Sequence, residues 1–324
     1  MTIRFPWQRR PLSVFVLAAV AGLGLFVRPI GGVEGGQSRR ETDGARLLRG
    51  AVDLHWHVDA SHRGSEFYQR GDVATVKLAR SRGMRALVLK HHNEPTAGLA
   101  YIVRLEVPDF DVFGGIVLNL PNGGINPAAV KFMATETKGN IGRVVWMPAG
   151  DAEAEARASK EPNRPFVRIS QGGKLLPEVK EVISVIAKHG LALASGHIAP
   201  EDALMVFREA RTQGVQRMIA THPMELAGKM TLPQMQEAAK LGAIIEVDFR
   251  NALQDGRMDN IRALGPEHCF ISEFWTKNEF PVQYAGLDGV GAFAAVMREH
   301  GFTDADLDIM FKRNPARLLG LPVQ

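Results

Sequence analysis

Two histidines, one residue apart, end a short apolar run in the sequence AVDLHWHVDA, residues 51–60 of this 324-residue chain. If the run is a β-strand, its side chains alternate, so His55 and His57 point the same way with Cα atoms about 7 Å apart. Two imidazoles at that separation can converge on one metal ion. The pair alone fits ordinary polar residues at a strand end equally well, so the positions of other polar residues must decide.

Further histidines occupy equivalent positions along the chain. His92, His197 and His222 lie at the ends of other apolar runs, RALVLKHH, LALASGH and QRMIATHP. Ionisable side chains at the carboxyl ends of barrel strands point into the mouth, where ligands bind. Sites built from histidine and carboxylate accept zinc, manganese, iron or cobalt. We therefore predict that His55, His57, His197 and His222 bind one or two divalent ions, with zinc as the first choice.

Strand-like runs alternate with amphipathic segments from residue 51 onward. The runs are 51–57, 85–92, 112–120, 142–148, 191–197, 216–223, 243–249 and 268–274. Segments between them, such as 175–190 and 200–214, have helical periodicity and end on glycine, as helices commonly do. Eight such units in about 270 residues predict an α/β fold of the (β/α)8 TIM-barrel type. The competitor, a doubly wound sheet, would carry a glycine-rich phosphate loop after its first strand, and the sequence has none there.

One insertion, residues 150–175, separates the fourth strand from its helix. Its segment FVRISQGGKLL predicts a small hairpin with Gly172 and Gly173 at the turn. On a barrel this insertion lies among the loops of the active-site end, where it would cover or shape the site.

The amino terminus has features of an export signal. A basic start precedes an apolar run, Leu12–Val27, that is short for a membrane span, and Arg9-Arg10 in QRRPLS resembles a twin-arginine signal. Because no clear cleavage site follows, an uncleaved membrane anchor is the alternative. We expect an exported, periplasmic protein, or one anchored in the membrane and facing outside. The predicted divisions are a signal peptide or membrane anchor at 1–30, a linker at 31–50 and a metal-dependent barrel at 51–324.

Composition restricts the partners. The chain is 45% hydrophobic and 23% charged, as expected of a globular protein with a core, and its net charge of +4 owes much to arginines in the first 50 residues. No basic block interleaved with aromatics follows, so we expect a small-molecule substrate and no nucleic acid. The single cysteine, Cys269, excludes an intrachain disulfide framework.

The order of these motifs resembles that of the amidohydrolase superfamily: DLHWH on the first strand, SGH on the fifth, THP on the sixth and an acid ending the eighth. LKHHNEPTAGLA, GGIVLNLPNGGINPAAV, VVWMP, LLPEVKEV and NPARLLGL resemble more closely an uncharacterised family of metal-dependent hydrolases within it, over about residues 51–322. The resemblance implies that His55 and His57 hold one metal, while His197 and His222 bind a second or complete the first.

The resemblance also gives the acid of strand eight, Glu273, a double role. It would contact the metal and take a proton from its bound water, whose pKa a divalent ion lowers from 15.7 towards about 7. Relatives carry aspartate there, whereas this chain has glutamate in CFISEFW. A misplacement of about 1 Å can cost on the order of 100-fold in rate, so either the pocket accepts the longer arm or the chemistry is altered.

Lys90 and His92 join Glu273 as candidate catalytic residues. Lys90 ends the run ALVLK, so its ammonium would enter the mouth beside His92. Carboxylated, it could bridge two metals, as a lysine on another strand does in many members of the superfamily. As an amine it could bind an anionic substrate or donate a proton.

Three residues at strand ends are candidates for substrate binding: Asn119, Asn122 and Asp248. Asn122 could instead support its own turn, and Asp248 could orient a histidine or cap the following segment. Asp53 is a candidate partner for an imidazole N–H.

The function that these residues predict is a metal-dependent hydrolase. A metal-activated water would attack a C–N or C–O bond in an amide, cyclic amide or lactone, with a phosphoester as a close variant. One alternative is a metal-dependent decarboxylase or lyase on the same barrel, in which the metal anchors a carboxylate and Lys90 binds the anion. The other is a non-catalytic exported binding protein.

Overall fold

The structure is a computed structural model. It describes residues 43–58, 72–136, 140–161, 163–225, 229–248, 252–253, 256–274 and 289–323. The predicted signal or anchor at 1–30 lies outside these residues. Within the part that is described, no helix combines the length and apolar character needed to cross a membrane.

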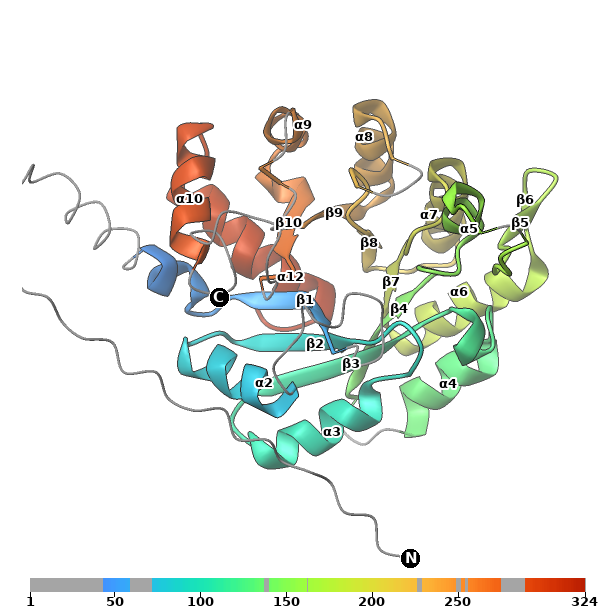
Figure 1. Ribbon diagram of the computed structural model, residues 1–324, viewed down its shortest axis with the longest axis horizontal. Coiled ribbons are helices and arrows are strands. Elements are labelled where there is room, and N and C mark those ends of the chain that lie inside the picture. The colour runs from blue at the N-terminus through green and yellow to red at the C-terminus, as the bar shows by residue number, and fades with distance from the viewer. Residues whose placement is uncertain are drawn as a thin grey trace, which may run out of the picture.

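Eight strands form one parallel sheet that bends into a nearly closed barrel surrounded by helices (Figure 1). They are β1 (Val52–His57), β2 (Ala86–Lys90), β3 (Asp111–Val117), β4 (Gly142–Trp146), β7 (Ala192–Ala194), β8 (Met218–Ala220), β9 (Ala243–Asp248) and β10 (Cys269–Ser272). Each predicted strand is confirmed. Neighbours in the sheet follow chain order, which excludes the doubly wound alternative, because that fold reverses direction at its first strand.

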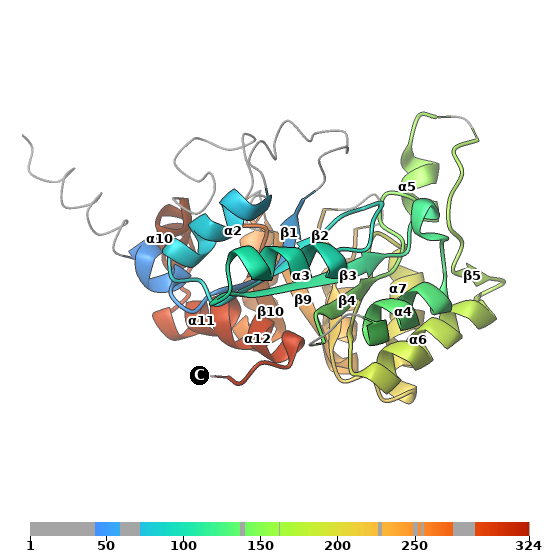
Figure 2. The same cartoon turned by 90° about the horizontal axis from the view of Figure 1, so that it is seen from below.

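Helices cover the outside of the barrel (Figures 1 and 2). The longer ones are α2 (Asp72–Ser81), α3 (Ala97–Glu106), α4 (Pro127–Glu136), α6 (Pro177–His189), α7 (Pro200–Thr212), α8 (Leu232–Leu241), α9 (Arg257–Leu264) and α10 (Val290–Glu299). The short ones are α5 (Glu153–Ala158), α11 (Asp304–Asp308) and α12 (Asn314–Leu319). Gly190 ends α6 in the left-handed conformation, as its sequence position predicted, and Gly242 ends α8 in the same way.

The strands divide the buried side chains into two clusters. One lies within the barrel and includes Val88, Trp146 and Phe270, with Leu318 of α12 packed beneath them. The larger cluster lies between the strands and the helices. This double layer keeps the strands rigid and leaves their carboxyl ends free for polar side chains.

Two segments next to the barrel follow from their sequences. Strands β5 (Ser170–Gln171) and β6 (Lys174–Leu175) pair as an antiparallel hairpin, which confirms the predicted turn at Gly172 and Gly173. The expected linker at 31–50 contributes its last residues to the fold, since residues 43–48 are helical and Leu47 and Leu48 are buried.

A buried carboxylate joins the first and last strands of the barrel. Asp53 Oδ1 accepts hydrogen bonds from the backbone N–H of His55 (2.9 Å) and of Glu273 (3.2 Å), and Oδ2 accepts one from Phe274 (2.9 Å). No ladder joins β1 to β10 in the described part of the chain, so this side chain takes the place of ladder bonds at the mouth. The expectation that Asp53 partners an imidazole is wrong, because its oxygens face backbone donors.

Burial raises the pKa of Asp53 from 3.8 to about 6, although the backbone donors oppose the shift. The carboxylate is therefore ionised near neutral pH and makes strong hydrogen bonds, but it is costly to bury.

Asp53→Asn tests this junction. An amide has one acceptor oxygen and turns an NH2 group towards backbone donors, so we expect a loss of about 2–4 kcal/mol in the free energy of unfolding. Chemical denaturation at pH 7 measures the loss, with Asp109→Asn as the control, since Asp109 makes an exposed ion pair with Arg80. A variant as stable as the control would show that the junction does not hold the barrel.

Candidate metal centre

Three buried residues from distant parts of the chain come together at the mouth. His55 belongs to β1, His222 follows β8 and Glu273 follows β10, and their potential ligand atoms all lie within 4.8 Å of one another. Glu273 Oε1 is 3.4 Å from His55 Nε2 and 3.8 Å from His222 Nε2. Ligand atoms of a tetrahedral zinc site, with bonds of about 2.1 Å, are about 3.4 Å apart, so the spacing fits a metal.

An irregularity in β1 aims its histidines. The register with β2 shifts between Asp53 and Trp56, and the Trp56 indole N–H donates to Thr75 Oγ1 (3.3 Å), towards α2. The rings of His55 and His57 lie side by side, with centroids 4.7 Å apart. The predicted common direction of the two imidazoles is therefore confirmed.

Glu273 has an unusual backbone conformation, with a φ of +59°. This left-handed region is uncommon for residues other than glycine, and it persists where surrounding contacts hold the chain. Here the contacts are the hydrogen bonds from the N–H groups of Glu273 and Phe274 to Asp53. The turn brings a carboxylate on a longer arm to the two imidazoles.

The turn SGH places His197 beside His222. Gly196 has a φ of +59°, and a Cβ there would lie 2.2 Å from the Met147 carbonyl oxygen, so only glycine fits. The backbone of His197 then donates to the Pro148 carbonyl (2.9 Å). The rings of His197 and His222 meet edge to face, with centroids 5.1 Å apart.

The predicted histidines thus come together in one cluster, and their role as metal ligands stays a prediction. His57 stacks on His92 at 5.0 Å, and His197 packs on His222. Among the described residues, the group whose ligand atoms all lie within 4.8 Å contains neither His57 nor His197. His57 lies next to His55, and His197 lies next to His222.

Glu246, in the middle of β9, is a member of the site that sequence reasoning missed. His55 Nδ1 donates to Glu246 Oε1 at 2.7 Å, and Ser272 Oγ donates to the same oxygen at 2.6 Å. Burial raises the pKa of Glu246 to about 7, and the hydrogen bond from Ser272 opposes the rise. An acid within the apolar run AIIEVD was the available signal, because such residues are rarely buried without a partner.

Lys90 contacts the other nitrogen of the same imidazole. Its Nζ donates to His55 Nε2 at 2.7 Å and lies 5.6 Å from the centre of the Trp146 ring. His55 therefore carries its proton on Nδ1, towards Glu246, and presents a lone pair on Nε2. That lone pair is the one a metal would use.

Asp248 lies beside a second missed acid, Glu225. Burial and a hydrogen bond with Asp248 raise the pKa of Glu225 from 4.5 to about 10, and Arg257, at 3.4 Å, opposes the shift. Glu225 is thus protonated at neutral pH and shares its proton with Asp248. The loop after β8 that carries Glu225 gave no strand or helix signal by which to place it.

The two asparagines bind backbone groups. Asn119 accepts a hydrogen bond from Ala149 N (2.8 Å) and donates to the His92 carbonyl (3.1 Å), which links three strand ends. Asn122 donates to the Val117 carbonyl at 2.7 Å and thereby supports its turn. Their predicted contact with substrate stays a prediction.

The donors suit a divalent ion. Burial lowers the pKa of His197, with Glu155 opposing the shift, so the imidazole is neutral and able to coordinate. Its Nε2 is buried, and no hydrogen-bond partner for it lies among the described residues. Buried imidazole and carboxylate donors together are the set that zinc, manganese and iron accept.

Comparison with known proteins places the chain in a family. A family model described as a family of unknown function, DUF6282, matches residues 50–246, which is more than half of the sequence. The chain belongs to this family. No curated protein matches the DUF6282 chain.

Solved structures share the fold of the DUF6282 chain. An organophosphorus hydrolase from Deinococcus radiodurans is 16% identical, with a TM-score of 0.54 over 86% of this chain and 94% of that one. A mutant PTE-like lactonase from the same organism is 14% identical, with a TM-score of 0.55 over 86% and 97%. An amidohydrolase from Pseudomonas aeruginosa is 12% identical, with a TM-score of 0.53 over 86% and 98%. At these identities the likeness shows the barrel fold.

Glu246→Gln tests how the DUF6282 chain positions His55. Glutamine cannot accept both hydrogen bonds with a full negative charge, so the Nδ1–H orientation of His55 is less favoured. We expect zinc affinity to fall about 10–100-fold, measured by competition with a chelator. Glu178→Gln, at the exposed start of α6, is the matched control. Equal affinity in both variants would contradict a positioning role for Glu246.

Glu225→Gln tests the shared proton. Because the pKa of Glu225 is about 10 in the folded chain and 4.5 in the ordinary carboxyl, its stabilising effect is complete below pH 4.5 and is lost as pH rises towards 10. Glutamine keeps a hydrogen-bond donor for Asp248 and does not titrate.

The measurement is the free energy of unfolding between about pH 5 and pH 9. As pH rises, the free energy of unfolding of the parent should fall relative to that of Glu225→Gln by up to about 1.4 kcal/mol per pH unit. Glu181→Gln, an exposed residue of α6, should run parallel to the parent. If the free energy of unfolding of Glu225→Gln depends on pH as that of the parent does, Glu225 is not protonated in the folded chain at neutral pH.

Proposed function

We propose that this protein is a metal-dependent hydrolase of small molecules. One observation carries the proposal: His55, His222 and Glu273, from three strand ends, are buried with potential ligand atoms within 4.8 Å of one another. Imidazole nitrogens and carboxylate oxygens are the ligand atoms that divalent transition metals prefer. The site also lies at the carboxyl end of a parallel barrel, where barrel enzymes bind their substrates.

His55, His222 and Glu273 would hold the ion, with His57 and His197 completing the site for one ion or two. A bound divalent cation supplies a nucleophile at neutral pH by lowering the pKa of water, and it polarises the bond under attack. Glu246 keeps the lone pair of His55 Nε2 directed into the site. His92 stacks on His57, so a substrate bound at the centre would lie near it.

Glu273 is the proposed general base. Its Oε1 lies between the two imidazoles, at 3.4 and 3.8 Å, from where it would take a proton and return it to the leaving group. The left-handed backbone at this position supports the view that the pocket accepts the longer glutamate arm. Its backbone anchor to Asp53 limits how far the carboxylate can move.

Lys90 and a metal would compete for the same lone pair of His55, since Lys90 Nζ lies 2.7 Å from Nε2. For His55 Nε2 to hold a metal, the head of Lys90 would have to lie away from this nitrogen. The displaced head would either bridge two metals as a carbamate or hold an anionic part of the substrate.

For the bond that is cleaved, we favour a carbon–oxygen ester or lactone. The named structural neighbours include a PTE-like lactonase and an organophosphorus hydrolase, which makes lactones and phosphotriesters the first probes. Cyclic amides and dipeptides follow, because the amidohydrolase neighbour has the same fold.

The test is a screen of these four classes with zinc- or manganese-reconstituted protein, followed by Glu273→Gln on any substrate found. Loss of the base should lower kcat about 100- to 10,000-fold while saturating metal keeps the site filled. Metal content of the variant is measured alongside the rate, and Glu178→Gln is the control.

Two results count against the proposal. If Glu273→Gln turns over substrate at the parent rate with metal bound, Glu273 is not the general base. Protein purified gently with less than about half an equivalent of metal, and unable to take up zinc, would remove the centre itself and favour a non-catalytic role.

A further inference from the structure

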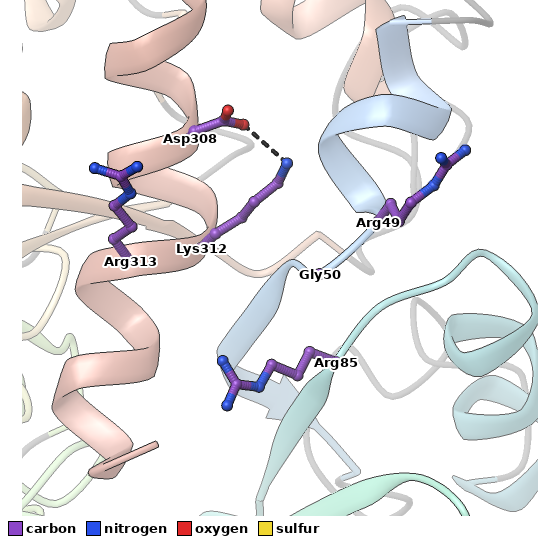
Figure 3. Close-up of a pocket in the computed structure, with 6 residues that line it drawn as sticks. All are labelled: Arg49, Gly50, Arg85, Asp308, Lys312 and Arg313. Atoms are coloured by element: carbon purple, nitrogen blue, oxygen red, sulfur yellow. Dashed lines mark ion pairs between the residues drawn. The ribbon is translucent and has the colours of Figure 1, made fainter. Parts of the chain in front are cut away.

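A cavity lies at the opposite end of the barrel from the candidate metal centre. It measures about 420 Å³ and is lined by Arg49, Gly50, Arg85, Asp308, Lys312 and Arg313 (Figure 3). Gly50 immediately precedes β1 and Arg85 immediately precedes β2, so the cavity opens where these strands begin. The histidines lie where the strands end, roughly 20 Å away along β1. The proposed hydrolase chemistry uses none of the residues in this cavity.

The lining carries an excess of positive charge. Four of its side chains are cationic and one, Asp308, is acidic, which gives a net charge of +3 around the cavity. That carboxylate is already shared, since it pairs with Lys312 at 2.8 Å and with Arg46 at 3.2 Å. Among the described residues, Arg49 and Arg313 form no ion pair. Like charges held together in this way are unfavourable unless an anion joins them.

Part of the cationic lining is held in place by the fold. Arg85 Nη1 donates to the Pro322 carbonyl at 2.7 Å, and Lys312 Nζ donates to the Arg46 carbonyl at 3.2 Å. In Figure 3, Arg85 extends from its strand towards the helix that carries Lys312, with Arg313 and Arg49 on opposite sides. Two cations are therefore oriented before any ligand binds, and two exposed guanidinium groups remain available to it.

The helix that supplies two of these cations has an irregular turn. Residues Ile309–Arg313 form a π-helical turn, η6, between α11 and α12. Such turns widen the helix by one residue and are frequent at functional sites. This turn carries both Lys312 and Arg313 on consecutive positions at the cavity.

We propose that this cavity is a binding site for a phosphate monoester. A dianionic phosphate is opposite in sign to the net charge of +3 of the lining, and its several oxygens can accept charge-assisted hydrogen bonds from cationic side chains. A single carboxylate has half the charge and fewer acceptors. The volume suits a phosphate with a small organic group attached.

The same phosphate chemistry is found in a free phosphorylated metabolite and in a lipid headgroup. The experiment therefore has one arm for each source.

The first arm measures binding of inorganic phosphate and of glycerol phosphate to the metal-loaded full chain by calorimetry. The parent should bind with a Kd of about 1 mM or tighter. The double variant Arg49→Gln with Arg313→Gln should bind at least about 10-fold more weakly, because each arginine supplies charge-assisted hydrogen bonds. Both side chains are exposed, so the variant should fold and keep the parent's metal content.

A matched control removes the same charge elsewhere. Lys131→Gln with Lys188→Gln takes two exposed cations from α4 and α6, away from the cavity. This control should bind phosphate as the parent does. Phosphate that binds at the metal centre is unaffected by either double variant, so such binding is distinguished from binding at the basic cavity.

The second arm measures co-sedimentation of the same chains with phosphatidylcholine vesicles containing phosphatidate, and with vesicles containing phosphatidylserine. Binding that favours phosphatidate and is lost in the arginine variant identifies a lipid headgroup as the ligand. Phosphate binding in the first arm without this preference identifies a free phosphate ester. If the arginine variant matches the lysine control in both arms, the cavity is not a phosphate site.

Discussion

The geometry of the whole site depends on a single carboxylate that accepts hydrogen bonds from the backbone. Asp53 accepts hydrogen bonds from the backbone N–H of His55 in the first strand and from those of Glu273 and Phe274 after the last strand. It therefore sets the separation of the two strands that supply a histidine and the candidate base. The same bonds hold Glu273 in a left-handed conformation that few residues adopt unaided. The same hydrogen bonds therefore close the barrel and fix the geometry of the site.

The mouth collects more acids than its cations balance. Asp53, Glu246, Asp248 and Glu273 are all buried there. The fold handles the excess locally: backbone donors face Asp53, an imidazole and a hydroxyl face Glu246, and a shared proton joins Glu225 to Asp248. Lys90 supplies one buried positive charge. A divalent ion is the simplest addition that would satisfy what remains.

Local patterns in the sequence predicted much of this arrangement. Alternation of strands and helices gave the eight-stranded barrel, and paired glycines gave the hairpin of the insertion. Histidines at strand ends predicted a cluster at the mouth, and the structure brings them together because parallel strands end at the same edge. These inferences needed only periodicity and the direction of the chain.

Side-chain contacts across the barrel could not be predicted from such local patterns. Glu246 is 191 residues from His55, and Asp53 is 220 residues from Glu273, so no spacing relates them. Asp53 was misassigned because strict alternation was assumed in β1, whereas the strand contains an irregularity at that point. The basic cavity joins three segments, around residues 49, 85 and 312, that have no common motif.

The two outermost strands of the sheet contribute to the same centre, and this has a consequence for biosynthesis. A nascent chain that has emerged only as far as β9 holds at most two of the three central residues, because Glu273 follows β10. The three side chains therefore come together only after β10 has been synthesised and has joined the barrel.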